Sequence, residues 1–206
     1  MEINWLGRNC FRLRGRDGVL ITDPCPKESG YTLGKPPANI VTLSRKDDPG
    51  YSAVAAVGGE PRVLDAPGDY EIGGILIHGV AVKRADGTRN VIFVAELDGV
   101  KVAHLGQLTS APTAATLEEV GDVDVLLIPV GGGNALTGAL AQDIMTAMDP
   151  RIAIPMNYKT EAETMDLEPL ERFLKETGSK VEPLPRLQVS KSSLPAELSV
   201  VVLGTK

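Results

Sequence analysis

Apolar and polar positions alternate in short blocks through the first half of the chain. The apolar blocks are separated by glycine, proline and aspartate, a pattern typical of strands joined by tight turns. Asp17-Gly18 and Asp98-Gly99 stand between two such blocks each, as β-hairpins require. Strands are therefore expected over 3–6, 10–13, 19–22, 40–43, 74–82, 90–97 and 100–105, and an alanine-rich helix over 51–57.

In the second half of the chain, segments whose apolar residues have helical spacing alternate with segments that resemble buried strands. The stretch 125–130 is nearly all apolar, which indicates a strand covered on both faces. Apolar residues at helical spacing predict a helix over 137–148, and Asp166 is a candidate N-cap for a helix that ends before Gly178. Further elements are expected as a helix over 112–120 and strands over 151–155, 181–184 and 198–203. Mixed sheets with helices outside them predict a layered α/β sandwich.

Composition narrows the class of protein. The chain has 206 residues, 43% of them hydrophobic and 23% charged, which suits one folded domain spanning 1–206. Its net charge of −6 argues against general binding to nucleic acid or to an anionic membrane. Glu2, Asn4 and Arg8 interrupt the region where a signal peptide would be apolar. Two cysteines, Cys10 and Cys25, form no disulfide framework, so a cytoplasmic protein is expected.

Six segments resemble, in order along the chain, the motifs of the metallo-β-lactamase-fold hydrolases. The first resembles the family's Leu-Gly-His-Ser-Cys-Phe, and the fourth its His-Leu-Gly-Asp. The segments are 3–11, 20–24, 67–74, 104–108, 128–133 and 154–160. The resemblance implies a four-layer αβ/βα sandwich, with two αβ halves over roughly 1–110 and 111–206. It also implies hydrolysis of an ester, amide or phosphoester by metal-bound water.

The residues that would bind metal in this family are replaced here. Arg45 and Asp47 stand where the resemblance places the first two histidines of His-x-His-x-Asp-His, and Arg84 stands near a later one. Gln107 replaces the bridging aspartate, and Asn157 replaces the closing histidine. Zinc prefers imidazole nitrogen or thiolate sulfur, whereas a guanidinium has no lone pair to offer. We therefore expect no zinc and no other cofactor.

A cluster of fixed cations is expected in place of the metals. At ~4 Å a guanidinium repels a divalent ion by about 8 kcal/mol at an effective dielectric constant of ~20. Carboxylates could instead pair with the arginines, which suggests a salt-bridge network with Asp23, Asp47, Asp48 and Asp69 as candidate partners. The candidate cleft comprises Arg45, Asp47, Asp48, Arg84, Gln107 and Asn157, with Arg8 and Asp23 nearby.

Other signals have simpler interpretations. His78 and His104 are expected to be structural or surface residues, because a catalytic metal normally needs three or four converging ligands. The glycine-rich stretch 130–134 follows a strand and lacks the Lys-Ser/Thr of a phosphate-binding loop, so it reads as a tight connection. Arg12, Arg14 and Arg16 share one strand face, which is usually a solvated face.

Three functions remain open. The favoured one is a non-catalytic protein, acting as a scaffold, as a protein's partner or as a binder of a small anionic ligand. The second is a hydrolase with an atypical oxygen-rich site, using Asp47, Asp48, Gln107, Asn157 and His104, which would suit Mg²⁺, Mn²⁺ or Ca²⁺. The third is a structural homo-oligomer. The first is favoured because a lone aspartate base would supply only about 10²- to 10⁴-fold rate enhancement.

Overall fold

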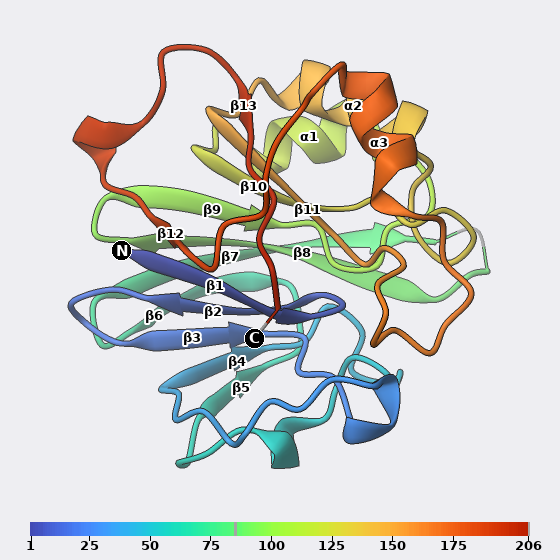
Figure 1. The fold of residues 1–206 in the computed structure, drawn as a ribbon. Helices are drawn as coiled ribbons and strands as arrows, with labels where there is room; N and C mark the ends of the chain where they lie inside the picture. The colour runs from blue at the N-terminus through green and yellow to red at the C-terminus, as the bar shows by residue number, and fades with distance from the viewer. Residues whose placement is uncertain (85, 206) are drawn as a thin grey trace.

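Two β-sheets lie face to face, and the α-helices are gathered on the outer side of the second sheet (Figure 1). The computed structural model describes residues 1–84 and 86–205. The main apolar core fills the space between the sheets and continues beneath the helices. No helix in these two ranges is long and apolar enough to cross a lipid bilayer.

The first sheet has the strand order β12-β1-β2-β3-β4-β5. Strands β1 to β3 are antiparallel, and β3, β4 and β5 run parallel. The Asp17-Gly18 turn forms as expected, with the Gly15 amide donating to the Gly18 carbonyl at 3.0 Å. The strands are β1 (Glu2–Gly7), β2 (Cys10–Arg14), β3 (Val19–Thr22), β4 (Ile40–Thr42), β5 (Arg62–Leu64) and β12 (Leu187–Gln188).

The second sheet has the order β13-β11-β10-β9-β8-β7-β6. Strands β6 to β9 are antiparallel, while β9, β10, β11 and β13 are parallel. Every residue of β10 and β11 is buried, as the apolar runs predict. The strands are β6 (Gly68–Ile72), β7 (Ile75–Lys83), β8 (Arg89–Leu97), β9 (Val100–His104), β10 (Val125–Pro129), β11 (Ile152–Met156) and β13 (Ser199–Val200).

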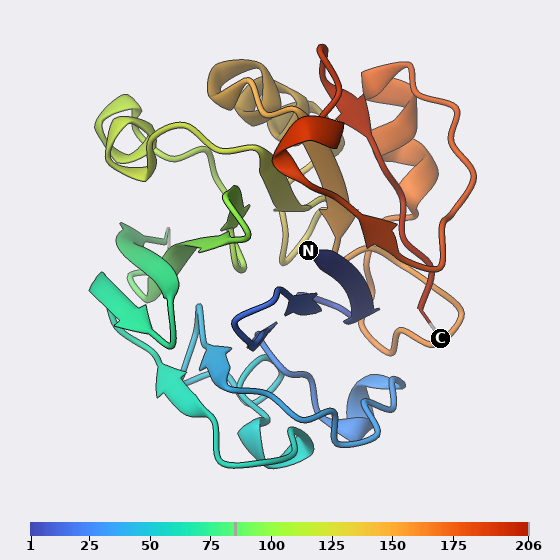
Figure 2. The same cartoon turned by 90° about the vertical axis from the view of Figure 1, so that its left-hand side faces the viewer.

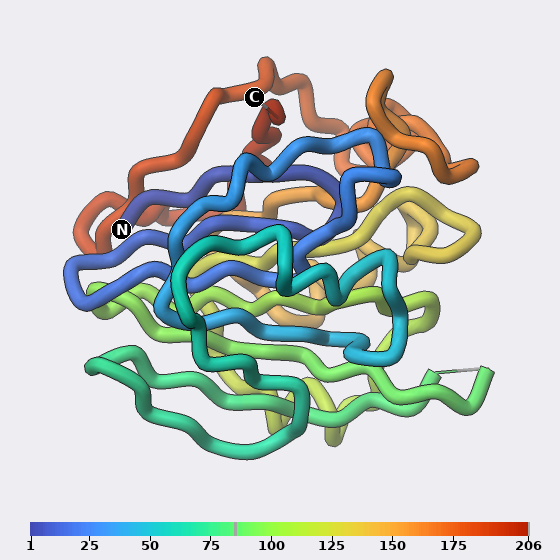
Figure 3. The backbone as a smooth tube through the Cα atoms, turned by 90° about the horizontal axis from the view of Figure 1, so that it is seen from below, coloured from blue at the N-terminus to red at the C-terminus, as the bar shows by residue number. Residues whose placement is uncertain are grey.

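The outer layers of the sandwich differ. Helices α1 (Ala114–Val120), α2 (Gly138–Met148) and α3 (Leu170–Thr177) cover the second sheet (Figure 2). The outer face of the first sheet is covered mainly by loops and by two single-turn 3₁₀ helices, Lys27–Ser29 and Val54–Ala56 (Figure 3). The predicted mixed α/β sandwich is thus confirmed, with loops providing most of one outer layer.

Several element predictions were wrong in detail. The helix expected over 51–57 is only the 3₁₀ turn Val54–Ala56. The helix expected to begin after Asp166 begins at Leu170. The residues before it are held by a contact outside the helix, because the Glu168 amide donates to the Gly131 carbonyl at 2.6 Å. The strand expected over 181–184 is a single bridge between Leu184 and Leu203, and the last strand is limited to β13. The short strands β5, β6 and β12 were not predicted.

Candidate functional site

The candidate residues meet at one edge of the sandwich, where several strands end. Arg8 lies in the turn after β1, Arg45 in the loop after β4, and Gln107 and Asn157 follow β9 and β11. Parallel strands bring their carboxyl ends to the same edge, and loops at that edge are the usual site of function in α/β folds. Main-chain contact across the sheets joins the two halves of the site, because the Asn157 amide donates to the Arg8 carbonyl at 3.2 Å.

Two arginines converge on Gln107. Arg45 donates from Nη1 to Gln107 Oε1 at 2.6 Å, and Arg84 donates from Nη1 to the Gln107 main-chain carbonyl. Asp48 lies 3.3 Å from Arg45, and Asp86 lies 3.5 Å from Arg84. The position where the resemblance places a metal-bridging carboxylate is therefore occupied by a glutamine whose side-chain and main-chain oxygens each accept from a guanidinium.

The guanidinium of Arg45 is close enough to Arg84 to affect the pKa of Arg84. Burial lowers the pKa of Arg84, and the nearby charge of Arg45 lowers it further. A guanidinium nevertheless remains protonated in proteins. Arg84 also donates to Asn134 Oδ1 at 3.3 Å, so the glycine-rich loop after β10 helps to hold it. The site thus retains two fixed positive charges at neutral pH.

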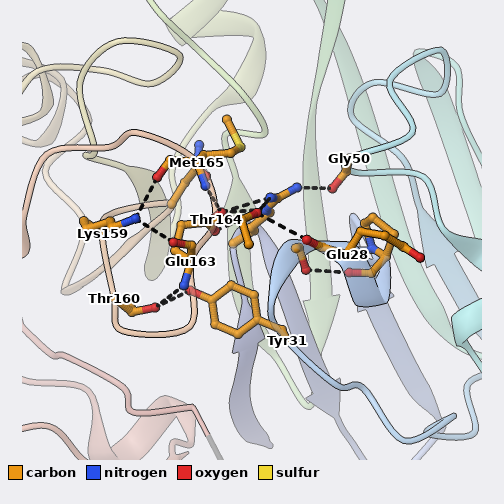
Figure 4. A network of polar contacts seen from close by, with 12 residues as sticks. Glu28, Tyr31, Gly50, Lys159, Thr160, Glu163, Thr164 and Met165 are labelled. Carbon is orange, nitrogen blue, oxygen red and sulfur yellow. Dashed lines mark hydrogen bonds and ion pairs between the residues drawn. The ribbon is translucent and has the colours of Figure 1, made fainter.

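A second polar cluster surrounds Glu163 (Figure 4) and contains one arginine, Arg8. Arg8 donates from Nε and Nη2 to the Glu163 carboxylate, the shortest distance being 2.9 Å. Both residues are buried, with 6% and 3% of their surfaces exposed. Burial by itself would lower the pKa of Arg8, but the hydrogen bond and charge of Glu163 outweigh it and raise that pKa. Arg8 also lies over the Tyr51 ring, 5.9 Å from its centre.

Tyr51 links this cluster to Asn157. Its hydroxyl donates to Asn157 Oδ1 at 3.4 Å, and burial raises the pKa of Tyr51 to about 12. The hydroxyl therefore remains protonated and acts as a donor rather than as a base.

The expected carboxylate partners are only partly correct. Asp48 pairs with Arg45 as expected, but Asp23 accepts two hydrogen bonds from Ser44, through its amide at 2.6 Å and its hydroxyl. Burial raises the pKa of Asp23 to about 7 despite these bonds. Asp47 is exposed, and Asp69 lies against His78 at 2.6 Å, away from the cluster.

Three residues of the site adopt a left-handed backbone. The φ angles are +48° for Arg8, +36° for Asp23 and +53° for Asn157. This region is uncommon outside glycine, although asparagine and aspartate tolerate it best. Such conformations persist only where surrounding contacts enforce them, and they concentrate at functional sites.

Two buried amide groups in the site have donors without partners. The oxygen of Gln107 accepts from Arg45 and that of Asn157 from Tyr51, which leaves Nε2 of Gln107 and Nδ2 of Asn157 unpaired. A buried unpaired donor costs about 1–3 kcal/mol, so both groups favour an acceptor beside them. An amide N–H has no lone pair to offer a metal ion, so neither nitrogen could serve as a ligand.

The residues present do not fit the metals of the resembled family. Within residues 1–84 and 86–205 no three His, Cys, Asp or Glu side chains converge on a point where an ion could bind. His104 is buried against the Asn9 carbonyl at 2.8 Å, and burial lowers its pKa to about 4. For the two cysteines burial has the opposite effect: it raises the pKa of Cys10 and of Cys25, which keeps both as thiols.

A small cavity of about 150 Å³ opens at the Arg45 side of the site. Arg45, Lys46 and Arg89 give it three positive charges against the two carboxylates of Asp47 and Asp65. Ser44 and Thr88 complete its lining. The cavity is polar and has a net positive charge.

Four members of the site were not predicted from the sequence: Tyr51, Asp86, Asn134 and Glu163. Glu163 carries no local signal, because it becomes buried only when the 158–168 segment folds over Arg8. Tyr51 was assigned to a helix, and Asn134 to a simple connection. Asn134 could have been found from its place directly after a buried parallel strand, where loops often bind ligands.

Comparison with known proteins identifies the family. Residues 2–157 match the family described as beta-lactamase superfamily domain. The crystal structure of a Thermotoga maritima protein of the metallo-β-lactamase superfamily, a candidate Zn-dependent hydrolase, is 34% identical. It superimposes with a TM-score of 0.86, covering 100% of this chain and 99% of that one.

Two archaeal proteins are also similar to this chain in sequence. A UPF0173 protein of Pyrococcus furiosus is 29% identical over 183 residues, which cover 79% of this chain and 86% of the relative. A UPF0173 metal-dependent hydrolase of Methanosphaerula palustris is 26% identical over 192 residues, covering 78% and 84%. The chain belongs to the metallo-β-lactamase superfamily.

Proposed function

We propose that this chain is a metal-independent, non-catalytic member of its superfamily that binds a small anionic ligand beside the Arg45–Arg84 cluster. The observation that carries the proposal is the convergence of both guanidinium groups on Gln107. In this proposal, cations fixed to the protein take the place that the resemblance assigns to the family's metal ions.

The local chemistry supports an anion as the ligand. Arginine presents several N–H groups that match the oxygens of carboxylate and phosphate. The 150 Å³ cavity beside Arg45 is large enough for a small oxyanion and carries more positive than negative groups. The unpaired amide donor of Gln107, whose oxygen accepts from Arg45, also favours an acceptor nearby.

The lack of a suitable base argues against catalysis. Metal-dependent hydrolysis needs a metal-bound hydroxide, and the residues here do not fit a metal. Asp23 is enclosed by Ser44, and Tyr51 remains protonated, so neither replaces that hydroxide.

Elemental analysis and titration with inorganic phosphate test the two parts of the proposal. After incubation with Zn²⁺ or Mn²⁺ and removal of free ions, we expect no stoichiometric metal. Phosphate, titrated by calorimetry at constant ionic strength, should bind, and Arg45→Gln should weaken it about tenfold through loss of a charge-assisted hydrogen bond. Arg172→Gln, which removes an exposed arginine from α3, is the matched control.

The names of the relatives favour a different function, metal-dependent hydrolysis. Stoichiometric metal in the purified protein, together with esterase or phosphoesterase activity that a chelator abolishes, would establish that function and overturn the proposal. Phosphate binding that Arg45→Gln and Arg172→Gln weaken equally would refute the assigned anion site.

A further inference from the structure

A groove of about 370 Å³ lies on the second sheet, apart from the arginine cluster. Its floor is formed by β6 to β9 and one wall by the end of α1. Helix α1 covers only part of this face, so the sheet surface beyond Val120 is left open. The groove is lined by Asp69, Tyr70, Leu76, Ile77, His78, Val94, Glu96, Lys101, Val120, Gly121 and Asp122.

The strand register explains why these side chains lie together. His78 is opposite Asp69 on one side and Val94 on the other, while Leu76 is opposite Glu96, which in turn is opposite Lys101. Directly opposed residues of antiparallel strands point to the same face. The two rows therefore form one continuous patch.

The floor of the groove is apolar and partly open to solvent. Leu76 is 49% exposed, an unusual position for a leucine on a sheet that helices otherwise cover. Val94 and Val120 are buried beside it. Binding of an apolar group to this floor is favourable, because the group displaces water from apolar surface.

The rim is acidic. Asp69, Glu96 and Asp122 supply three carboxylates against the single ammonium of Lys101, a formal balance of −2 with His78 neutral. His78 is held by Asp69 at 2.6 Å and therefore keeps its ring at the edge of the groove. Charge complementarity favours a cationic ligand here, the opposite of the arginine cluster.

We propose that this groove binds a small organic cation with an apolar body, such as an aromatic or alkyl ammonium compound. The volume lies near the lower end of the range for ligand pockets, which limits the ligand to a small molecule. The apolar body covers Leu76 and Val94, and the ammonium group lies among the carboxylates of the rim. The site is independent of the arginine cluster and of any metal.

Three probes with one aromatic body test the charge preference. We expect benzyltrimethylammonium to bind at least about tenfold more tightly than phenylmethanesulfonate, with benzyl alcohol in between. Binding is followed by calorimetry and by NMR shifts of the Leu76 methyl groups. Asp122→Asn and Glu96→Gln should each weaken the cation severalfold and leave benzyl alcohol unchanged.

Matched variants separate the groove from general effects. Leu76→Ser should weaken all probes that bind about five- to tenfold, because it removes apolar floor. Leu184→Ser is the control, since Leu184 is 43% exposed elsewhere on the surface. Glu60→Gln, an exposed carboxylate outside the groove, controls for net charge.

Three outcomes would overturn the proposal. These are equal binding of the cationic and anionic probes, equal effects of Leu76→Ser and Leu184→Ser, and a dimer in light scattering that Leu76→Ser converts to a monomer. The last result would assign the groove to a second copy of the chain.

Discussion

At the scale of single residues, the ion pair between Arg8 and Glu163 is the contact with the clearest energetic consequence. Both side chains are buried, so removing one charge leaves the other without a partner in a poorly solvated place. We expect Glu163→Gln to destabilise the fold by about 3–5 kcal/mol. Urea unfolding measures this loss.

Two further variants establish that burial is the cause. Glu168→Gln breaks the surface pair with Arg172 and should cost less than about 1 kcal/mol. The double variant Arg8→Met with Glu163→Leu should recover much of the loss, because a buried pair can be replaced by apolar groups at little cost. Equal losses of stability for Glu163→Gln and Glu168→Gln would contradict the burial of the Arg8–Glu163 ion pair.

Asp23 provides a residue-scale prediction about pH. Its pKa is raised to about 7 by burial, whereas an unfolded aspartate has a pKa of about 3.9. The native state therefore holds the proton more tightly, and this contribution to stability is complete below about pH 4 and lost as the pH rises to about 7.

The variant Asp23→Asn isolates that contribution. The free energy of unfolding of the wild type, relative to the variant, should fall between about pH 4 and pH 7, by at most about 1.4 kcal/mol per pH unit, and level off above. Urea unfolding of both proteins across this range gives the difference. A difference that rises with pH would show that Asp23 is stabilised as a carboxylate.

At the scale of elements, the 158–168 segment closes the site over Arg8 and depends on a close approach at Gly30. A Cβ on Gly30 would lie 1.7 Å from the Ala162 carbonyl oxygen, and its φ is +91°. We expect Gly30→Ala to push this segment away and to speed amide hydrogen exchange across it. The Tyr31–Thr160 hydrogen bond, 2.7 Å long, should be lost with it.

Gly34 provides the matched control for the backbone effect. Its φ is +72°, but no atom lies within 4 Å of its added Cβ. Gly34→Ala therefore carries only the left-handed strain of about 1–2 kcal/mol and should leave exchange in 158–168 unchanged. Similar exchange in both variants would mean that the contact with Ala162 is not important.

The elements that could be predicted from the sequence are those with a strong local pattern. The apolar run of β10 and the hairpin at Asp98-Gly99 needed no tertiary information. The start of α3 could not be predicted, because a distant bond from Glu168 to Gly131 decides it. Strands as short as β12 exist only because a neighbouring strand completes them.

At the scale of the whole molecule, the sequence motifs name candidate positions but not the partners that those positions take. The structure brings Arg45, Gln107 and Asn157 to one edge of the sandwich, and their role as a functional site stays a prediction. The partners Glu163 and Asp86 depend on long-range folding or on loop geometry, which no residue pattern encodes.

Reversing four of the five replaced positions together tests whether they form the equivalent of the family's metal centre. If the scaffold still holds the family's geometry, Arg45→His, Arg84→His, Gln107→Asp and Asn157→His in one variant should restore zinc binding. Histidine tolerates the left-handed backbone of residue 157, and the variant removes two repelling charges while adding four ligands. Zinc should then raise its melting temperature, since a ligand that binds only the native state stabilises it. The wild type, heated with the same zinc, should show no such rise. Zinc stabilisation of the wild type, or none in the variant, would mean that these positions do not form the equivalent of the family's metal centre.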